Sequence, residues 1–362
     1  MSFGVYLHVP FCAHRCDYCA FATWTDRSHL VDAYLAACRA DITRAVAAGM
    51  PPATSVFVGG GTPSLVPAGA LVDVVGAIPV VPGAEITVEC NPDTVTPALV
   101  DSYLSAGVNR LSFGVQSMIA HVLRALGRTH RPENVRAAVE TARRAGVPTF
   151  NLDLIYGGAG ETLQDWRRTL DETLALEPAH VSAFALTVEP GTPLAADRRR
   201  HPDDDDQADK YHLATEMLTA GGLHWYEISN WARPGHECRH NQLYWRQGDY
   251  LGFGCAAHSH RAGRRWWNVR TPERYIEAIA SGCSPETASE RLDAETAAIE
   301  RLQLALRTAD GIPADALPAD DAAELGALVE RRGDRIVLTV AGRLLANEVA
   351  LRLTPPPVAA AP

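Results

Sequence analysis

The chain has 362 residues, of which 47% are hydrophobic, and a formal net charge of −10. This length suits one large α/β domain with a smaller appendage, because single domains rarely grow beyond about 300 residues. The negative charge argues against a nucleic-acid scaffold, which presents basic side chains to phosphates.

The start of the sequence lacks the pattern of a signal peptide. MSFGVYLHVPFC has no basic start, no long apolar stretch and no small-residue cleavage site, and no run of about 18 apolar residues follows. We therefore expect a soluble, cytoplasmic protein with no transmembrane segment. The eight cysteines are unlike a secreted disulfide framework, which belongs to smaller chains, so reduced thiols that bind metal are the better interpretation.

The first half of the chain alternates between strand and helix patterns. Apolar runs without clean alternation, typical of strands buried on both faces, occupy residues 5–9, 55–58, 86–89, 110–115, 149–155 and 181–186. Helices are predicted between them at 28–48, 67–77, 97–106, 132–145 and 163–176. This alternation predicts a parallel sheet with right-handed crossovers.

Unusual residues gather where these strands end. They are Cys12 to Cys19, Gly59 to Gly61, Glu89, Gln116 and Asp153. Parallel α/β folds build their sites at the carboxyl ends of the strands. Periodicity alone does not separate an open sheet from a curved one, and our prediction is an α/β fold with a partial (β/α)6 TIM-like barrel.

The alternation of strand and helix patterns ends after about Gly191. The arginines at 198–200 precede the aspartates at 203–206, a run more typical of a solvated loop and helix start than of a docking site. We divide the chain into a core at 1–223 and an irregular aromatic and His-rich segment at 224–290. A small C-terminal helical, winged-helix-like domain follows at 291–354 and includes a strand at 335–339. The tail at 355–362 is predicted to be disordered.

Three thiols, Cys12, Cys16 and Cys19, occur at C-x3-C-x2-C spacing on the loop after the first predicted strand. A cubane iron–sulfur cluster takes one ligand per iron, so three cysteines leave one iron open. The alternatives are a zinc site and buried free thiols. A structural zinc site takes four ligands. The fourth ligand would have to be a residue far along the chain, such as Cys238, His240 or Cys255.

A glycine run and four polar residues complete the candidate site. Gly60, Gly61 and Thr62 follow a strand, where glycines let backbone groups approach a ligand, although an ordinary tight turn has the same composition. The polar residues are Glu89, Gln116, Arg128 and Asp153. The two carboxylates carry more weight, because acids in buried strands are rare unless paired or functional. Arg128 could form a surface salt bridge instead of contacting a cofactor.

The cysteine spacing followed by GGGTP resembles the radical S-adenosylmethionine (SAM) superfamily. The resemblance implies that 1–223 is a radical SAM core, with a [4Fe–4S] cluster whose open iron is chelated by SAM. The stretches YLHVPFC, ITVECNPD, RLSFGVQS and FNLDLIYG are similar, in order and spacing, to the oxygen-independent coproporphyrinogen III oxidase-like subgroup. That subgroup's pattern implies contacts with the cluster-bound cofactor for Tyr6, Gly60, Gly61, Thr62 and Glu89. It also implies that Gln116, Arg128 and Asp153 match positions that contact a second cofactor molecule in the oxidase.

Two features point to the heme-chaperone branch of this subgroup. Phe21 stands where the oxidase has a fourth cysteine, which argues against coproporphyrinogen decarboxylation as the activity. His240, Asn241, Tyr244 and Trp245 match the H-N-x-x-Y-W motif of that branch. Histidine is a common heme ligand and aromatic rings offer flat apolar faces. Alternatively, His240 and Asn241 satisfy buried backbone groups under the barrel.

The resemblance implies a protein that binds heme and inserts it into a heme-accepting protein such as a respiratory-chain component, with a homodimer as a further possibility and nucleic acid not expected as a partner. Two alternatives remain. One is a radical oxidase of coproporphyrinogen III, or a relative with another substrate. The other is a non-catalytic module with zinc in the cysteines.

Overall fold

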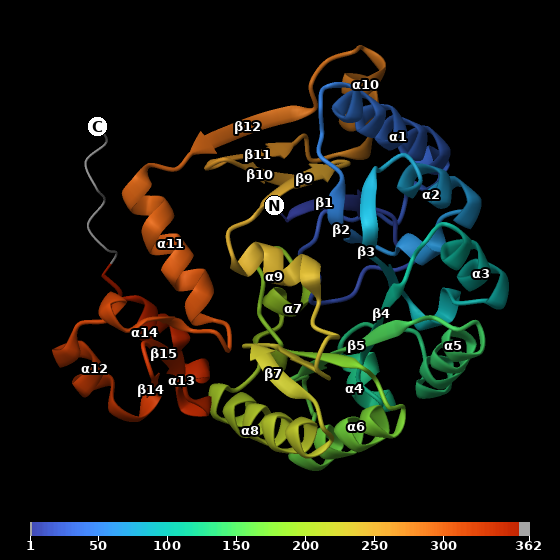
Figure 1. Cartoon of the computed structure of the whole chain (residues 1–362). Helices are drawn as coiled ribbons and strands as arrows, with labels where there is room; N and C mark the ends of the chain where they lie inside the picture. Colours follow the sequence, from blue (N-terminus) through green and yellow to red (C-terminus); the bar gives the residue numbers. More distant parts are fainter. Residues whose placement is uncertain (1, 355–362) are drawn as a thin grey trace, which may run out of the picture.

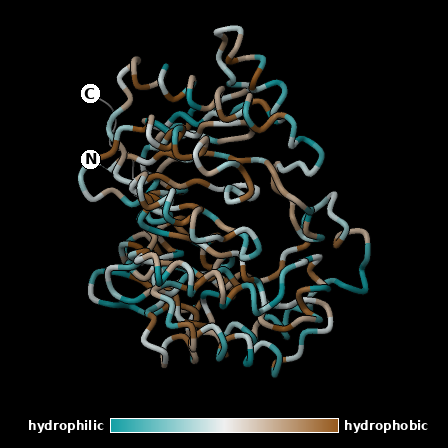
Figure 2. Tube along the Cα trace, turned by 90° about the vertical axis from the view of Figure 1, so that its right-hand side faces the viewer, coloured by the Kyte–Doolittle hydropathy of each residue, from teal (hydrophilic) through white to brown (hydrophobic). Residues whose placement is uncertain are grey.

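The computed structural model describes residues 2–354. Six parallel strands lie side by side in chain order and curve around a central space, with helices outside them (Figure 1). They are β1 (Phe3–Val9), β2 (Ala53–Gly60), β3 (Val80–Cys90), β4 (Arg110–Gln116), β5 (Thr149–Tyr156) and β6 (His180–Ala185). The α/β fold with a partial parallel barrel is confirmed. Hydrophobic stretches run through the interior, and hydrophilic ones concentrate in the outer loops (Figure 2).

The crossover helices follow the predicted pattern. They are α1 (Val31–Ala47), α2 (Ala68–Val75), α3 (Pro97–Ser105), α5 (Pro132–Arg144) and α6 (Leu163–Ala175). Thr96 and Thr162 cap α3 and α6 by accepting hydrogen bonds from backbone N–H groups. The sequence patterns missed α4 (Ala120–Ala125) and the short 3-10 turns η2 (Pro63–Leu65) and η3 (Pro92–Thr94). The 3-10 turn η1 (Ser28–Leu30) lies inside the helix predicted at 28–48.

The arginine–aspartate run forms a turn and a helix start, as predicted, but Arg200 is partly buried against Asp17. Residues 198–200 form a 3-10 turn, η4 (Arg198–Arg200), after the short α7 (Pro193–Ala196), and the aspartates begin α8 (Asp204–Ala220). Asp203 caps α8, because its side chain accepts a hydrogen bond from the backbone N–H of Asp206. Acidic side chains in the first turn also favour the helix dipole.

The segment 224–290 is not irregular as expected but lengthens both edges of the sheet. β7 (His224–Glu227) and β8 (Asn230–Ala232) extend the β6 edge. On the other edge, β9 (Asp249–Phe253) pairs parallel with β1, followed by β10 (His258–Arg261), β11 (Arg264–Asn268) and β12 (Glu286–Arg291). Helices α9 (Arg239–Trp245) and α10 (Pro272–Ala280) connect them. The strands are short and mostly half-buried, so they leave no clear period in the sequence.

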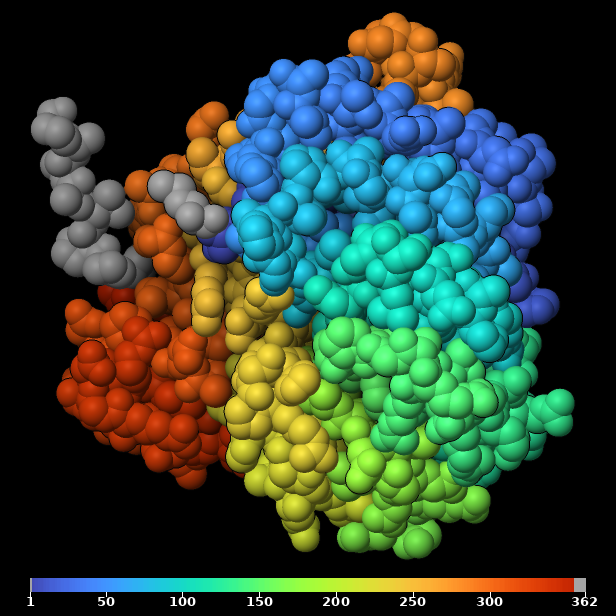
Figure 3. Space-filling model, turned by 45° about the vertical axis from the view of Figure 1, so that its right-hand side comes forward, coloured from blue at the N-terminus to red at the C-terminus, as the bar shows by residue number. Residues whose placement is uncertain are grey.

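The C-terminal part packs around its own apolar cluster, which includes Leu302, Leu306, Ile336 and Leu338. Its elements are α11 (Ala294–Leu306), β13 (Ile312–Pro313), η5 (Ala314–Ala316), α12 (Ala319–Leu325), η6 (Gly326–Leu328), β14 (Val329–Arg332), β15 (Arg335–Leu338), α13 (Val340–Leu344) and α14 (Ala346–Ala350). The predicted strand at 335–339 is β15, which pairs with β13 and β14. This part lies beside the segment that carries α9 (Figure 3). The tail predicted at 355–362 lies outside the described residues.

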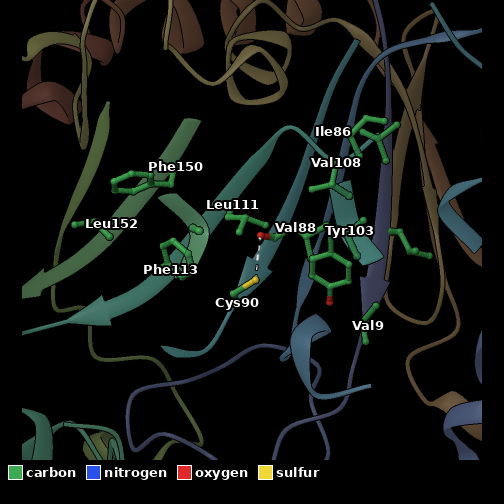
Figure 4. Packing of buried hydrophobic residues seen from close by; sticks show 14 of the residues in the cluster. Val9, Ile86, Val88, Cys90, Tyr103, Val108, Leu111, Phe113, Phe150 and Leu152 are labelled. Atoms are coloured by element: carbon green, nitrogen blue, oxygen red, sulfur yellow. Dashed lines mark hydrogen bonds between the residues drawn. The ribbon is translucent and has the colours of Figure 1, made fainter. Parts of the chain in front are cut away.

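The main hydrophobic core lies between the sheet and its outer helices. Val88, Leu111 and Leu152 are buried on neighbouring strands, and Tyr103 of α3 is 1% exposed (Figure 4). Strands buried on both faces hold their carboxyl ends at fixed positions, which is what a site built from several loops requires. Within residues 2–354, no helix has both the length and the apolar character needed to cross a membrane.

Candidate functional site

The three clustered cysteines lie on the loop that follows β1. The loop is tied to the chain around it, because Cys12 N–H donates to the Trp24 carbonyl and Cys19 N–H donates to the Cys16 carbonyl. All three cysteines are partly exposed. Four of the other five cysteines are buried, and Cys283 is exposed on its own. Accessible thiols are therefore concentrated at one end of the barrel.

Polar groups from two neighbouring segments approach these thiols. The Thr62 hydroxyl donates to Cys12 Sγ at 3.6 Å, and the Arg128 guanidinium donates to Cys16 Sγ at 3.5 Å. Burial raises the pKa of the Cys12 thiol, and the nearby Cys19 and Cys16 raise it further. Burial also raises the pKa of Cys19. Bound metal displaces the thiol proton, so donors placed at sulfur are suited to a metal-bound thiolate.

The arrangement fits an iron–sulfur cluster, which the three cysteines could hold. Within residues 2–354, no three His, Cys, Asp or Glu side chains are placed as ligands of a single metal ion. A cubane differs from a single ion in taking each thiolate on a different iron. Donors at Cys12 and Cys16, from Thr62 and Arg128, are hydrogen bonds of the kind that tune such clusters.

The glycine run packs directly against the end of β1. Gly60 has φ +106°, and a Cβ there would lie 2.3 Å from His8 Nδ1. A Cβ at Gly61 would lie 2.7 Å from the Val9 carbonyl oxygen. Gly61 N–H donates to that same carbonyl at 2.8 Å, and Thr62 N–H donates to the Phe11 carbonyl at 2.8 Å. Only glycine fits this close approach, which holds the run against the cysteine loop.

Two carboxylates near each other come from β3 and β5, the strands on either side of β4. Glu89 of β3 accepts a hydrogen bond from Gly60 N–H at 3.1 Å. Burial raises the pKa of Glu89 to about 8, and the charge of Asp153 adds to this effect. Asp153 of β5 accepts hydrogen bonds from Ser112 Oγ at 2.8 Å and Asn151 Nδ2 at 2.7 Å. These acids could accept hydrogen bonds from ligand hydroxyls or amino groups.

Gln116 and Arg128 meet at the end of β4. Gln116 has φ +63° at a register irregularity, so its backbone leaves the regular strand there. Arg128 donates to the Gly114 carbonyl at 2.7 Å as well as to Cys16. Arg128 therefore links β4 to the cysteine loop, and among the described residues it forms no salt bridge of the kind considered as its alternative.

Tyr6 lies on β1 and faces the barrel interior. Its hydroxyl is 3.0 Å from His8 Nδ1, and its ring stacks on Phe57 with centroids 6.4 Å apart. His8 also contacts the Ala22 carbonyl through Nε2 at 2.9 Å. Sequence reasoning did not single out His8. Its place two residues after Tyr6 on the same face of a strand is the signal that could have identified it.

The H-N-x-x-Y-W motif forms α9 at the opposite end of the barrel. His240 is 1% exposed, with Nδ1 3.0 Å from Ser55 Oγ and Nε2 2.8 Å from the Tyr244 hydroxyl. Its backbone N–H donates to Glu85 at 3.1 Å, and burial lowers its pKa to about 3. Ser55 lies near the amino-terminal end of β2 and pairs in register with Glu85 of β3. The structure thus places His240 as a buried, fully hydrogen-bonded side chain beside Ser55 of β2, away from the cysteines.

The other motif residues are more accessible. Asn241, Tyr244 and Trp245 are each partly exposed. The Trp245 ring faces the Arg307 guanidinium at 4.9 Å, and its indole N–H is buried without a hydrogen-bond partner among the described residues. The structure therefore separates the predicted site residues into a group at the cysteine loop and a group around α9.

The sequence matches the Radical SAM superfamily over residues 6–173. Among curated relatives, the heme chaperone HemW of Mycobacterium tuberculosis is 41% identical, covering 97% of this chain and 94% of the relative. The heme chaperone HemW of Bacillus subtilis is 35% identical, covering 96% and 97%. Among solved structures, the coproporphyrinogen III oxidase HemN from Escherichia coli, a radical SAM enzyme, is 24% identical with a TM-score of 0.83, covering 97% of this chain and 89% of that one. This last similarity bears on the fold alone.

Proposed function

The chain belongs to the radical SAM superfamily and, within it, to the HemW family of heme chaperones, and on that basis we propose that it binds heme and delivers it to a heme-accepting protein. The observation that carries this proposal is similarity over nearly the whole chain to proteins named heme chaperones. The similarity includes the C-terminal part and not only the barrel.

We propose that Cys12, Cys16 and Cys19 hold a [4Fe–4S] cluster. When bound, a cluster with three protein ligands offers an open iron that can chelate the amine and carboxylate of SAM. The partly exposed thiols and the donors from Thr62 and Arg128 support this assignment. Zinc is the alternative metal.

We assign the cofactor contacts to residues of the parallel strands and of the segments that follow them. Gly60, Gly61 and Thr62 would hold the methionyl amine, because their backbone runs against the loop. The remaining assignments are Tyr6 beside the cofactor, Glu89 at its ribose, and Gln116, Arg128 and Asp153 at a second cofactor position.

The heme contacts are proposed around α9. His240 already uses both ring nitrogens, so we assign to His240 and Tyr244 the role of positioning α9. Asn241 and Trp245 remain candidates for contact with the ligand, since both are partly exposed. A respiratory-chain component as recipient, a cytoplasmic location and a homodimer are further parts of the proposal.

The second candidate is the oxygen-independent oxidation of coproporphyrinogen III. It is considered because the chain shares the fold of HemN. Phe21 argues against it. It occupies the position of the oxidase's fourth cysteine, and its side chain is 67% exposed rather than packed in place of a ligand.

One anaerobic preparation separates these functions. The chain is reconstituted with iron and sulfide, and its metals are counted. One portion is titrated with heme, and another is incubated with SAM, a reductant and coproporphyrinogen III. We expect about four irons per chain, tight heme uptake and no porphyrin product. A variant with all three cysteines changed to alanine should lose the iron. Coproporphyrinogen conversion with release of 5′-deoxyadenosine and no heme uptake would overturn the proposal, and zinc in place of iron would overturn the cluster assignment.

A further inference from the structure

A cavity of about 510 Å³ lies between the barrel and the C-terminal part. One wall comes from β7 and α9, and the other from α11 and the loop that follows it. Its lining includes His224, Trp225, Gln242, Trp245, Arg301 and Arg335. Figure 3 shows the two parts side by side on the molecular surface. The cavity therefore contains two residues of the H-N-x-x-Y-W motif's helix but not His240.

The cavity offers flat aromatic surfaces. Trp225 and Trp245 are both partly exposed within it. Arginine side chains already lie over each indole, with Arg343 3.5 Å from the Trp225 ring and Arg307 4.9 Å from the Trp245 ring. Both indole N–H groups are buried without a hydrogen-bond partner among the described residues. Each indole is thus covered by an arginine on one face, and its remaining exposed surface suits contact with a planar apolar ligand that carries polar groups at its edge.

The charges at the cavity suit a ligand with carboxylates. Arg301 lines it, is exposed, and forms no ion pair with any residue in the described part of the chain. Arg246 is 3.6 Å from Asp310, but both side chains are largely exposed, so this pair is weak. Arg335 donates to the backbone carbonyl of Asp310 at 3.0 Å. The lining thus holds three arginines against the two carboxylates of Glu237 and Asp310.

The cavity also has an available metal ligand. His224, the first residue of β7, lines it and is exposed. Within residues 2–354 its ring has no hydrogen-bond partner, in contrast to His240, which has two. Histidine is the protein ligand of heme iron in globins and peroxidases.

We propose that heme occupies this cavity, with His224 as an axial ligand of the iron, Trp245 against the porphyrin face and Arg301 paired with a propionate. This inference rests on the proposed heme-binding function and specifies its site. In the sheet, His224 and the first residue of β6, His180, both pair with Ala232. The heme therefore lies toward the amino-terminal ends of the strands, whereas the cysteine loop follows the carboxyl end of β1.

Heme titration of single variants tests the site. His224→Ala should weaken heme binding by about tenfold or more and change the absorption spectrum, and added imidazole should restore the spectrum of the wild-type complex. Arg301→Ala should weaken binding by about threefold to fivefold without changing the spectrum. The matched controls are His212→Ala and Arg39→Ala, whose exposed side chains lie on α8 and α1, away from the cavity.

The outcomes distinguish a wrong heme site from a wrong heme-binding function. Heme bound by the wild type but with unchanged affinity and spectrum in His224→Ala would overturn the site and leave the heme-binding function intact. No heme uptake by the wild type would overturn both. Restoration of the spectrum by imidazole would exclude misfolding as the cause of the loss in His224→Ala.

Discussion

Arg200 donates hydrogen bonds of 2.6 Å to both Asp17 Oδ2 and the Ala125 carbonyl, so η4 is joined to the cysteine loop and to the end of α4. Asp17 lies between Cys16 and Cys19. Its backbone is held from both sides, because its N–H donates to the Leu126 carbonyl and its carbonyl accepts from Leu194 N–H. The loop that carries the three thiols is therefore positioned by contacts to two other segments.

Arg200→Ala should make the cluster easier to lose. The ion pair is partly buried, with side-chain exposures of 25% and 30%, so its removal should loosen the loop by about 1 kcal/mol. We expect the visible absorbance of the reconstituted cluster to decay several-fold faster under an iron chelator. Arg199→Ala is the control, because that side chain is 89% exposed and, among residues 2–354, its ion pair is with Asp197 alone. Equal decay rates in the two variants would contradict the positioning role of Arg200.

Gly61→Ala should destabilise the chain and weaken SAM binding. The added methyl group would meet backbone atoms of Val9 and Phe11 at 2.7 to 2.9 Å, and the strand cannot yield as a flexible side chain would. The free energy of unfolding in urea should fall by about 1–3 kcal/mol. Gly69→Ala, in α2 with nothing within 4 Å of the new Cβ, should instead gain up to about 1 kcal/mol. A Gly61→Ala protein as stable as the wild type would refute this packing argument.

Glu89 should make the stability of the cofactor-free protein fall as pH rises. Burial raises its pKa to about 8, whereas in the unfolded chain the pKa is about 4.3. Between these values the folded state binds more protons, so the stabilisation is complete below about pH 4.3 and lost as pH rises through about 8. From about pH 5.5 to about pH 8.5, the wild type should lose about 2–3 kcal/mol of unfolding free energy relative to Glu89→Gln. Parallel urea-unfolding curves for the two proteins at both pH values would contradict the raised pKa.

His240→Ala should lower the stability of the chain and leave its heme complex unchanged. Loss of the ring leaves Ser55 and Tyr244 without their buried partner and opens a cavity, at a cost of about 2–4 kcal/mol. Asn241→Ala, at a partly exposed neighbouring position, should change stability by less than about 0.5 kcal/mol. At a temperature where His240→Ala remains folded, its heme complex should keep the wild-type spectrum. Loss of that spectrum without loss of stability would identify His240 as the heme ligand.

Much of the barrel could be predicted because its signals are local. The six parallel strands are apolar runs, and a crossover helix lies between each strand and the next along the chain. The cysteine loop and the glycine run are likewise short motifs. Their spacing alone places them after β1 and β2, at the same edge of the sheet.

The remaining features depend on contacts between distant parts of the chain. β9 pairs with β1, yet β9 is a strand of only five residues without alternating burial. Asp17 and Arg200 are 183 residues apart, and nothing near either residue predicts their ion pair. The motif around His240 was visible in the sequence, but its burial depends on Ser55 and Glu85, which the folded barrel brings beneath α9.

Heme transfer tests the central claim most directly. The heme-loaded chain is mixed with heme-free b-type cytochrome from a respiratory chain, and the transfer rate is compared with passive heme release, measured by capture with apomyoglobin. A chaperone that hands over its ligand through contact should transfer heme faster than passive release, at a rate that rises with the concentration of the cytochrome. A rate equal to passive release at every cytochrome concentration would contradict delivery of heme by this protein.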